Sequence, residues 1–437
     1  MLKKIIGTTG TRILNALFTL IILLLITNKI GSTGMGIIGL IMVDIAIIQL
    51  SVDLFAGSSL IYFASRTNIG KLLFPAYLFI GGVLIFYYLL FLSGTAFFPV
   101  LLNSIVPDGY INHVLALSLL SSLMATHYNL LLGNERIKTY NIIFTIQICI
   151  LLLVFVAELF FFDNMTVTAY LIALYFAFSV GTILGFFTVI KKAGPLVMDG
   201  WTKVIKEVIR YGFITQMANL LSIGNNRLSF FFIKYFSGLS PLGIYTAGIQ
   251  LTEGLKLIGS SIAVVQFSAI SNTRDKDYAS NLTIKLMKFS LALTTLAVMV
   301  LVILPESFYV FLFSNDFTGV KPVIIALSPG VIALAANNIF SHYFSGLGNP
   351  KINLYAKGVG FIFTLILAII LIPEFGLVGA AITASVSYIS TVIYQYVVFK
   401  KQTNTPLRAW AINKNDFSDF KILVKEAFNS EHRKQKG

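Results

Sequence analysis

Long runs of hydrophobic residues recur from one end of the chain to the other, separated by short polar segments. Most runs hold about 20 residues, which is the length that an α-helix needs to cross a hydrocarbon core of about 30 Å. The alternation typical of transmembrane β-strands is absent from them. The pattern therefore predicts an all-α, polytopic membrane protein with about twelve transmembrane helices. The expected spans are residues 12–28, 36–63, 72–98, 114–133, 140–160, 168–190, 208–235, 244–270, 283–304, 321–345, 353–372 and 377–399.

Composition agrees with this interpretation. Of the 437 residues, 57% are hydrophobic and 11% are charged, whereas soluble domains are about 25% charged. The single cysteine, Cys149, lies inside an apolar run, so we expect no disulfide framework, no thiol metal site and no cofactor.

The distribution of basic residues predicts the orientation in the membrane. Of the 32 lysines and arginines, only Lys29, Lys234 and Lys321 fall in loops on one side, and Arg227 and Lys256 lie within spans. All the others fall on the opposite side. Because cytoplasmic loops collect lysine and arginine, we expect the chain in the inner membrane with both termini in the cytoplasm. The net charge of +14 then reflects topology, and we expect no nucleic-acid partner.

Two segments of the first half are repeated in the second half. The sequence ATHYNLLLGNERIKTY at 125–140 returns as FSHYFSGLGNPKINLY at 340–355, and GSTGMGII at 31–38 matches GLSPLGIY at 238–245. Each match pairs one span with the sixth span after it. Two parallel six-helix bundles related in this way enclose a central cavity, which is the architecture of a transporter.

The repeat divides the chain into four parts. We expect an N-terminal bundle at 1–190, a cytoplasmic linker at 191–207, a C-terminal bundle at 208–399 and a basic cytoplasmic tail at 400–437. In the linker, Trp201 and Ile205 share an apolar helical face while Lys203 and Lys206 lie elsewhere, which predicts an amphipathic helix at the membrane surface. The tail either is simply solvated or has a partner.

Polar residues within the spans are the candidate functional residues, because ionisable groups in a membrane usually face the interior and mark a pathway. The candidates for cargo binding are Arg227, Lys256, Arg12, Asn219, Asn226 and Gln250. The candidates for ion coupling are Asp44, Asp53 and Glu253.

Each of these candidates has a structural alternative. Glu253 and Lys256 could pair with each other, and Arg12 could anchor a helix end at the interface. Asp44 and Asp53 lie on opposite sides of a straight helix, so both face a cavity only if that helix bends or is buried all round.

Three segments resemble a known family: SGLSPLGIYTAGIQLTEGLKLIGSSI, GLGNPKINLYAKGVGF and LIPEFGLVGAAITASVSY. They are similar to the polysaccharide-exporter branch of the multidrug/oligosaccharidyl-lipid/polysaccharide flippase superfamily. The resemblance implies an O-antigen or capsule flippase that moves undecaprenyl-pyrophosphate-linked repeat units from the cytoplasmic to the periplasmic leaflet by alternating access. It also implies other polysaccharide assembly proteins as partners, and a cavity lined by Arg12, Asp44, Arg227, Glu253 and Lys256.

The chemistry of the candidates is consistent with that cargo. Arginine binds phosphate oxygens well, and asparagine and glutamine suit sugar hydroxyls. Asp44 or Glu253 is the expected site at which H⁺ or Na⁺ resets the carrier. A multidrug/cation antiporter of the same superfamily is the alternative, against which Arg227 and Lys256 argue. A lipid II or teichoic-acid flippase differs only in its sugar, and a membrane enzyme would need longer external loops than this chain has.

Overall fold

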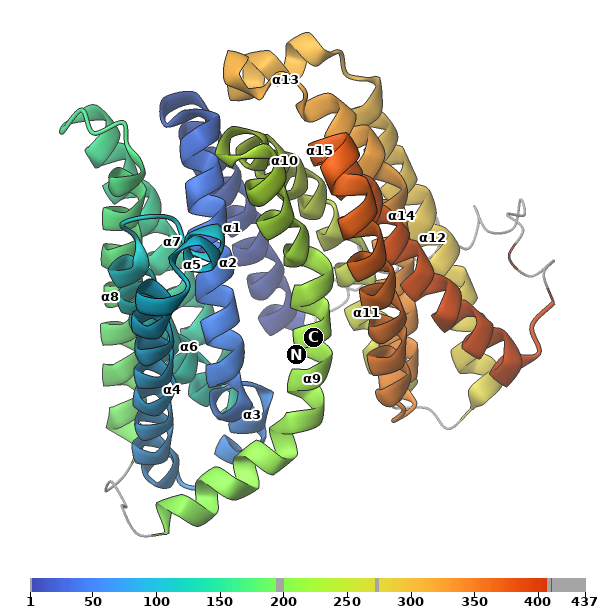
Figure 1. Cartoon of the computed structure of the whole chain (residues 1–437). Coiled ribbons are helices and arrows are strands. Elements are labelled where there is room, and N and C mark those ends of the chain that lie inside the picture. Colours follow the sequence, from blue (N-terminus) through green and yellow to red (C-terminus); the bar gives the residue numbers. More distant parts are fainter. Residues whose placement is uncertain (1, 194–199, 272–274, 407–409, 411–437) are drawn as a thin grey trace. The chain divides into compact units, whose positions relative to one another are not determined.

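The computed structural model describes residues 2–193, 200–271, 275–406 and 410, and every regular element in that part of the chain is a helix (Figure 1). The elements are α1 Leu2–Lys29, α2 Gly31–Ala56, α3 Ser58–Ala64, α4 Ile69–Phe97, α5 Pro99–Ile105, α6 Ile111–Gly133, α7 Ile137–Phe160, α8 Val167–Ala193, α9 Trp201–Ser237, α10 Leu239–Gly254, α11 Lys256–Ser271, α12 Lys276–Ile303, α13 Glu306–Phe313, η1 Asn315–Phe317, α14 Val320–Gly346 and α15 Lys351–Thr403.

Eight helical segments of the described chain are long and apolar enough to cross a membrane. The predicted all-α, polytopic class is therefore confirmed, while the count of twelve spans stays a prediction. Several predicted boundaries agree closely with the helices: the span expected at 72–98 is α4, and the span expected at 140–160 is α7. The start of α4 is set by Asn68, whose side chain accepts a hydrogen bond of 2.9 Å from the Gly70 amide.

Two predicted segments contain breaks that hydropathy does not reveal, and one predicted break, between residues 372 and 377, agrees with the structure. The segment 36–63 is interrupted at Gly57, which separates α2 from α3, and the segment 244–270 is interrupted at Leu255, which separates α10 from α11. The spans expected at 353–372 and 377–399 form α15, whose two helical parts meet at Gly376. This residue has φ +53°, a left-handed conformation that glycine adopts without steric cost.

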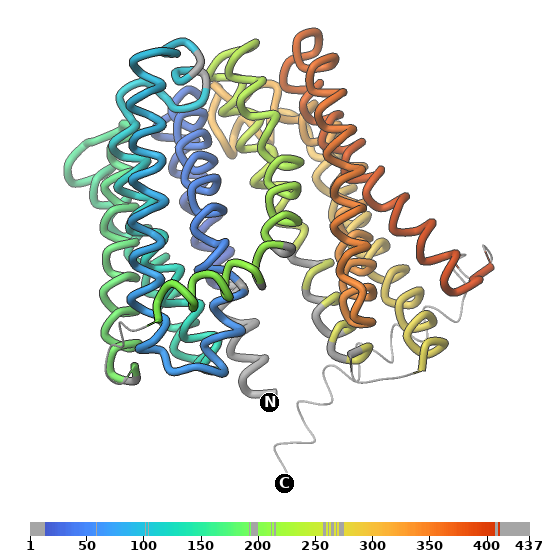
Figure 2. The backbone as a smooth tube through the Cα atoms, turned by 60° about the horizontal axis from the view of Figure 1, so that its bottom comes forward, coloured from blue at the N-terminus to red at the C-terminus, as the bar shows by residue number. Residues whose placement is uncertain are grey.

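The predicted linker at 191–207 and tail at 400–437 are described only in part. Residues 194–199 lie outside the described residues, as do 407–409 and 411–437. From Trp201 the chain continues as α9 without interruption to Ser237, and the first turns of α9 run at an angle to the rest of the helix (Figures 1 and 2). Lys203, Lys206 and Trp201 are exposed there and Ile205 is half-buried, so an amphipathic helix at the membrane surface stays a prediction.

The contacts divide the chain into two compact units, which are described separately. Unit 1 comprises residues 1–251, 305–323 and 366–381, and unit 2 comprises residues 252–304, 324–365 and 382–437. Whether the chain also divides functionally at 190 and 208 stays a prediction.

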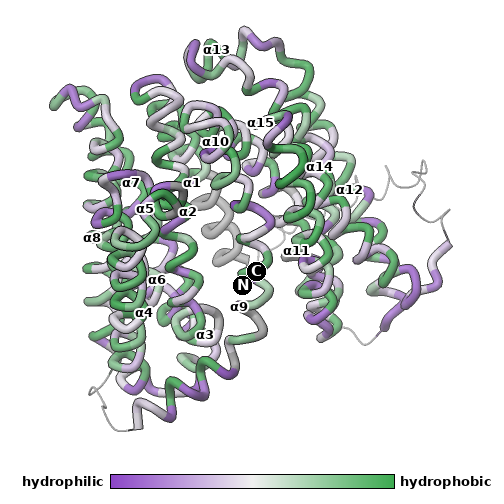
Figure 3. The backbone as a smooth tube through the Cα atoms, in the orientation of Figure 1, coloured by the Kyte–Doolittle hydropathy of each residue, from purple (hydrophilic) through white to green (hydrophobic). Residues whose placement is uncertain are grey.

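Unit 1 is built around α2. This helix packs against α1, α4, α6 and α9, and α6 and α7 pack against α8 (Figure 1). The surface of α4 is strongly apolar, with exposed Ile85, Phe86 and Leu89 (Figure 3). Large hydrophobic side chains exposed in this number match a surface that faces lipid.

Unit 2 has an aromatic core on α14 and the last part of α15. Phe340 packs against Phe399 with ring centroids 5.4 Å apart, and Trp410 covers both rings. Where Pro329 interrupts the hydrogen bonding of α14, the Ser385 hydroxyl donates to the Ala326 carbonyl at 2.6 Å. Pro329 is thus accommodated by packing against α15.

Candidate transport site

A chain of hydrogen bonds joins α2, α6 and α9 inside unit 1. Ser122 Oγ donates to Gln49 Oε1 at 3.0 Å, and Gln49 Nε2 donates to Asp53 Oδ1 at 2.8 Å. From α9, Gln216 Nε2 donates to the Asp53 carbonyl at 2.8 Å, and Asn219 Nδ2 donates to Gln216 Oε1 at 3.1 Å. We call these five residues the α2 polar cluster. Buried polar groups joined in this way are fixed in position, so the cluster presents an ordered set of amides and a carboxylate.

Asp44 is the second acidic residue of α2, and its surroundings differ from those of Asp53. Its side chain is 4% exposed, and Oδ2 has no hydrogen-bond partner among the described residues. The charge of Lys234 lies close enough to interact with both Asp44 and Asp108. The Lys234 ammonium also donates to the carbonyls of Asn103 and Val106. An incompletely paired buried carboxylate is energetically costly, so a proton or a cation at Oδ2 would stabilise this part of α2.

The contacts between α2 and α9 give the relative direction of the two helices. Asp53 on α2 contacts Gln216 on α9, and a Cβ added to Gly39 on α2 would lie 3.5 Å from the ring of Phe230 on α9. Because the residue number rises along α9 as it falls along α2, the two helices are antiparallel. Asp44 lies between these two contacts along α2, and Arg227 lies between them along α9. The Arg227 guanidinium is half-buried and stands 5.1 Å from the centroid of the Phe230 ring.

The remaining candidates are distributed as follows. Asn219 belongs to the α2 polar cluster, Asn226 is half-buried on α9, and Gln250 is exposed on α10. Glu253 ends α10 and Lys256 begins α11, and both belong to unit 2. Leu255 interrupts the helix between them, and their pairing stays a prediction. The side chain of Arg12 lies outside the described residues.

Sequence reasoning missed four contributors to this site, which are Gln49, Ser122, Gln216 and Lys234. Gln49 stands four residues before Asp53 on the same helical face, and this spacing could have indicated the hydrogen bond. Lys234 was assigned to an external loop because it follows an apolar run, yet its ammonium reaches the α5 region and interacts with a carboxylate of α2.

The repeated glycine segments meet each other in unit 1. A Cβ on Gly36 would collide with the Leu239 carbonyl oxygen, and a Cβ on Gly243 would collide with the Ser32 carbonyl oxygen. Gly36 and Gly243 occupy equivalent positions of the two repeats, and so do Ser32 and Leu239. The contact is therefore reciprocal, as at a local two-fold axis. We call it the glycine crossing of α2 and α10.

Further contacts hold the same end of α2. Ser32 Oγ lies 2.7 Å from Ser240 Oγ across the glycine crossing. The segment around α13 and η1 binds the end of α1, where Asn28 Nδ2 donates to the Leu312 carbonyl at 2.8 Å and Ser314 Oγ donates to the Thr27 carbonyl at 3.3 Å. The end of unit 1 that contains Gly31 is thus closed by backbone contact and by hydrogen bonds.

We expect alanine at Gly36 or Gly243 to lower the thermal midpoint by about the same amount, because each Cβ forces the same two backbones apart. An overpacked contact of this kind costs about 1–3 kcal/mol. The double variant should be no worse than the poorer single variant, since helices separated by one Cβ accommodate the second. Thermal midpoints of the purified variants in detergent measure this coupling.

Gly81→Ala is the matched control for that cycle, because a Cβ there meets nothing within 4 Å. Additive effects of Gly36→Ala and Gly243→Ala would contradict a shared contact.

Comparisons with known proteins show what the chain is similar to. The family described as "Lipid II flippase MurJ" matches residues 37–425. An uncharacterized membrane protein of Methanocaldococcus jannaschii is 28% identical over 197 residues, which are 44% of this chain and 39% of that protein. A probable low-salt glycan biosynthesis flippase of Haloferax volcanii is 24% identical over 174 residues, 38% of this chain and 36% of that protein. The chain thus aligns with well under half the length of either curated relative.

Among solved structures, one titled as a lipid II flippase MurJ in an inward closed conformation covers 94% of this chain and 89% of its own, with 17% identity and a TM-score of 0.67. At that level of identity the likeness shows a shared fold.

Proposed function

Since the chain belongs to the lipid II flippase MurJ family, whose members are transporters and not enzymes, we propose that its cargo is a glycan linked through pyrophosphate to a polyisoprenoid. The observation that carries this proposal is the family match over residues 37–425. Within that class we propose a surface-polysaccharide repeat unit, because the three segments quoted above resemble polysaccharide exporters.

The polar residues of unit 1 support an anionic, sugar-bearing cargo. Arg227 keeps its charge at any physiological pH, and a guanidinium can bind two phosphate oxygens at once. In a water-poor site such bonds offset the hydration that the pyrophosphate loses. Asn219, already ordered by the α2 polar cluster, offers an amide of the kind that hydrogen-bonds sugar hydroxyls.

We propose that the protein lies in a bacterial inner membrane with both termini in the cytoplasm, as the distribution of lysine and arginine suggests. Moving about two negative charges outward is then favoured by roughly 4–5 kcal/mol at 100 mV, if the charges cross the whole field. The membrane potential would therefore contribute directly to export.

The transport cycle in this proposal is alternating access. The glycine crossing is its closed gate at one end, and release of cargo at that end requires α2 and α10 to separate. Ser32, Ser240 and the contacts of the α13 region separate in the same step.

The decisive experiment is transport by the purified full chain in vesicles. We expect translocation of a synthetic polyprenyl-pyrophosphate disaccharide, and slower translocation of lipid II in a parallel series. Efflux of a cationic dye with no movement of either lipid would overturn the proposal and favour the multidrug/cation antiporter. Faster movement of lipid II than of the disaccharide lipid would place the chain among lipid II flippases.

Asp44 is the proposed site of ion coupling, by H⁺ or Na⁺, because its buried Oδ2 is unpartnered within the described residues. In the Asp44→Asn variant, an amide of nearly the same shape can no longer bind a proton or a cation in this way. We expect its transport rate to be insensitive to imposed pH and sodium gradients and still sensitive to the membrane potential. The measurement is the initial rate of lipid translocation in vesicles that carry a pH gradient, a sodium gradient or a membrane potential, one at a time.

Asp108→Asn is the matched control, because Asp108 also interacts with the charge of Lys234 but is exposed. An Asp44→Asn variant that retains the gradient dependence of the parent protein would exclude Asp44 from coupling.

A further inference from the structure

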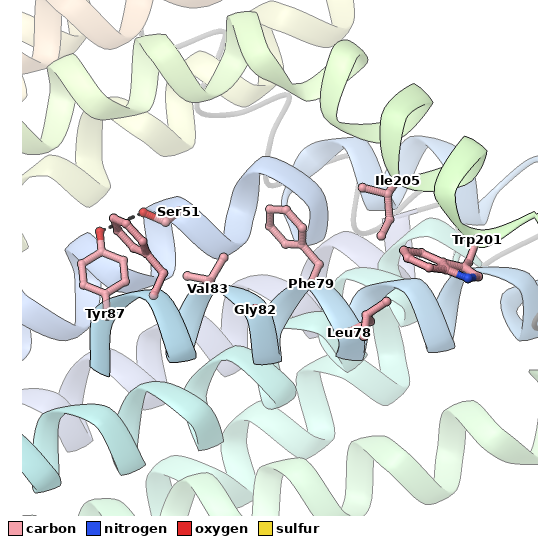
Figure 4. A pocket seen from close by; sticks show the side chains of 9 residues that line it. Ser51, Leu78, Phe79, Gly82, Val83, Tyr87, Trp201 and Ile205 are labelled. Atoms are coloured by element: carbon pink, nitrogen blue, oxygen red, sulfur yellow. Dashed lines mark hydrogen bonds between the residues drawn. The ribbon is translucent and has the colours of Figure 1, made fainter. Parts of the chain in front are cut away.

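Unit 1 has two pockets of different chemistry. An apolar groove of about 380 Å³ lies between α4, α2 and the first turns of α9, and no charged side chain lines it (Figure 4). The other pocket has a volume of about 390 Å³ and a mixed lining, apolar at Leu130, Leu131 and Val189 and polar at Thr67 and Arg136. Since only the second pocket offers a charged group to a ligand, it is the stronger candidate for a specific site.

This polar pocket lies at the end of unit 1 opposite the glycine crossing. α2 runs from the crossing to Ala56, and the pocket forms where the chain turns from α3 into α4 and from α6 into α7, beside the last turns of α8 (Figure 1). The distribution of lysine and arginine predicts that this end faces the cytoplasm. Neither α2 nor α9, which carry the candidate cargo residues of unit 1, lines the pocket.

Arg136 is the charged side chain of the pocket. It is half-buried just before α7, and its Nη1 donates to the Thr188 carbonyl on α8 at 3.5 Å. Within the described part of the chain this long contact is the one hydrogen bond of the guanidinium, so most of its N–H donors stay available. A guanidinium held in this way at the rim of a pocket can bind two oxygens of one phosphate.

The amino end of α4 adds to the positive potential of the pocket. Ile69 is the first residue of this 29-residue helix, and it lines the pocket beside Thr67 and the capping residue Asn68. The amino end of a helix carries a partial positive charge that favours anions.

The surroundings of the pocket carry an excess of positive charge. Segments 65–71, 134–138 and 188–191, which supply its polar lining, hold five basic residues and one acidic residue. The basic residues are Arg66, Lys71, Arg136, Lys138 and Lys191. The acidic residue, Glu135, is exposed and does not line the pocket. This excess favours an anionic ligand and disfavours one that carries an ammonium group.

Exposed apolar side chains border the same pocket. Ile137 follows Arg136 and is 36% exposed, while Phe187 and Ile190 on α8 are 58% and 40% exposed. A soluble phosphate compound leaves this border uncovered, whereas the acyl chains of a phospholipid cover it. The pocket volume corresponds to about a dozen groups of about 30 Å³ each, which is enough for a phosphodiester and its glycerol.

We propose that this pocket, the Arg136 pocket, binds the headgroup of an anionic phospholipid of the bilayer. The Arg136 guanidinium binds the phosphate oxygens, and the acyl chains lie along Ile137, Phe187 and Ile190. The bound lipid links the ends of α4, α6, α7 and α8 and so stabilises unit 1. This site is additional to the cargo pathway and does not depend on which cargo the protein carries.

The test is thermal unfolding of the purified, delipidated full chain in mixed micelles. We expect phosphatidylglycerol to raise the thermal midpoint in a saturable way. Phosphatidylethanolamine with the same acyl chains should need an amount at least about tenfold higher, because its ammonium is repelled by the basic residues around the pocket. Inorganic phosphate should leave the midpoint unchanged, because it has no chains to cover the apolar border.

Arg136→Gln and Lys138→Gln are the matched variants. Each removes one positive charge from the same end of unit 1, but only Arg136 lines the pocket. Arg136→Gln should raise the half-saturating mole fraction of phosphatidylglycerol by about tenfold or more, and Lys138→Gln should leave it unchanged.

A second pair does not touch the contact between Arg136 and Thr188. Thr67→Glu places a negative charge at the pocket lining, and Ser65→Glu places the same charge on an exposed residue of the same turn that does not line the pocket. Thr67→Glu should abolish the response to phosphatidylglycerol, and Ser65→Glu should retain it.

An equal response within each pair of variants would overturn the proposal. Stabilisation by inorganic phosphate as large as that by phosphatidylglycerol would also overturn it, in favour of a soluble anion, and equal stabilisation by phosphatidylethanolamine would remove the selection for an anionic lipid. Translocation of the disaccharide lipid reports separately on the proposed function, so either proposal can fail alone.

Discussion

A disulfide between residues 32 and 240 should reduce transport to the rate of vesicles without protein, and a reductant should restore it. The two serine hydroxyl oxygens lie 2.7 Å apart across the glycine crossing, which is close enough for the paired cysteines to adopt disulfide geometry. The variant is Ser32→Cys with Ser240→Cys, in a Cys149→Ser background that removes the native thiol. Because alternating access requires α2 to leave α10, a covalent link between them holds the carrier in one state.

The single-cysteine variants are the controls, since each carries one thiol and cannot form the link. Both should transport at the rate of the Cys149→Ser parent, with or without oxidant. Mobility on non-reducing gels gives the fraction linked, and residual transport should match the fraction that is not linked. Fully linked protein that still translocates lipid at the parental rate would show that this crossing is not the gate.

The sequence predicted the helices well because bilayer thickness imposes one requirement on every span, a run of about 20 apolar residues. The interruptions at Gly57 and Leu255 were not predictable in this way, because a break buried inside a membrane protein causes no change in hydropathy. The α10–α11 break matters most for the candidate site. It lies between Glu253 and Lys256, and whether these two side chains pair stays a prediction.

The candidate site was predicted in its residue types and only partly in its geometry. Asp44 and Asp53 project from different sides of α2, and both are largely buried because four helices surround this one. The repeat indicated that Gly36 and Gly243 are equivalent, yet a repeat does not reveal that its two copies touch. Their reciprocal contact depends on where the local axis passes through the structure.

Replacing Arg227 by glutamine should have the second large effect on transport. Hydrogen bonds to charged groups contribute about 1.5–3 kcal/mol, so loss of the guanidinium should lower transport of a pyrophosphate-linked glycan by about 10- to 100-fold. Arg227→Lys should recover part of this loss, because an ammonium keeps the charge without the planar pair of donors. Transport of a monophosphate-linked analogue should fall less, because fewer anionic oxygens lose their partner. Initial rates against cargo concentration measure these differences.

Arg66→Gln is the matched control for a purely structural role of Arg227. Arg66 also stacks on an aromatic ring, with its guanidinium 3.8 Å from the Tyr62 centroid, but it is exposed at the end of α3. If Arg227 only stabilises unit 1 through Phe230, then Arg227→Gln should lower the thermal midpoint and reduce transport of both analogues by the same factor. If Arg227 binds phosphate, the thermal midpoint should change little, and transport of the pyrophosphate-linked cargo should fall more than transport of the monophosphate-linked analogue. An Arg227→Gln variant that moves the pyrophosphate lipid at the parental rate would remove the guanidinium from the cargo pathway.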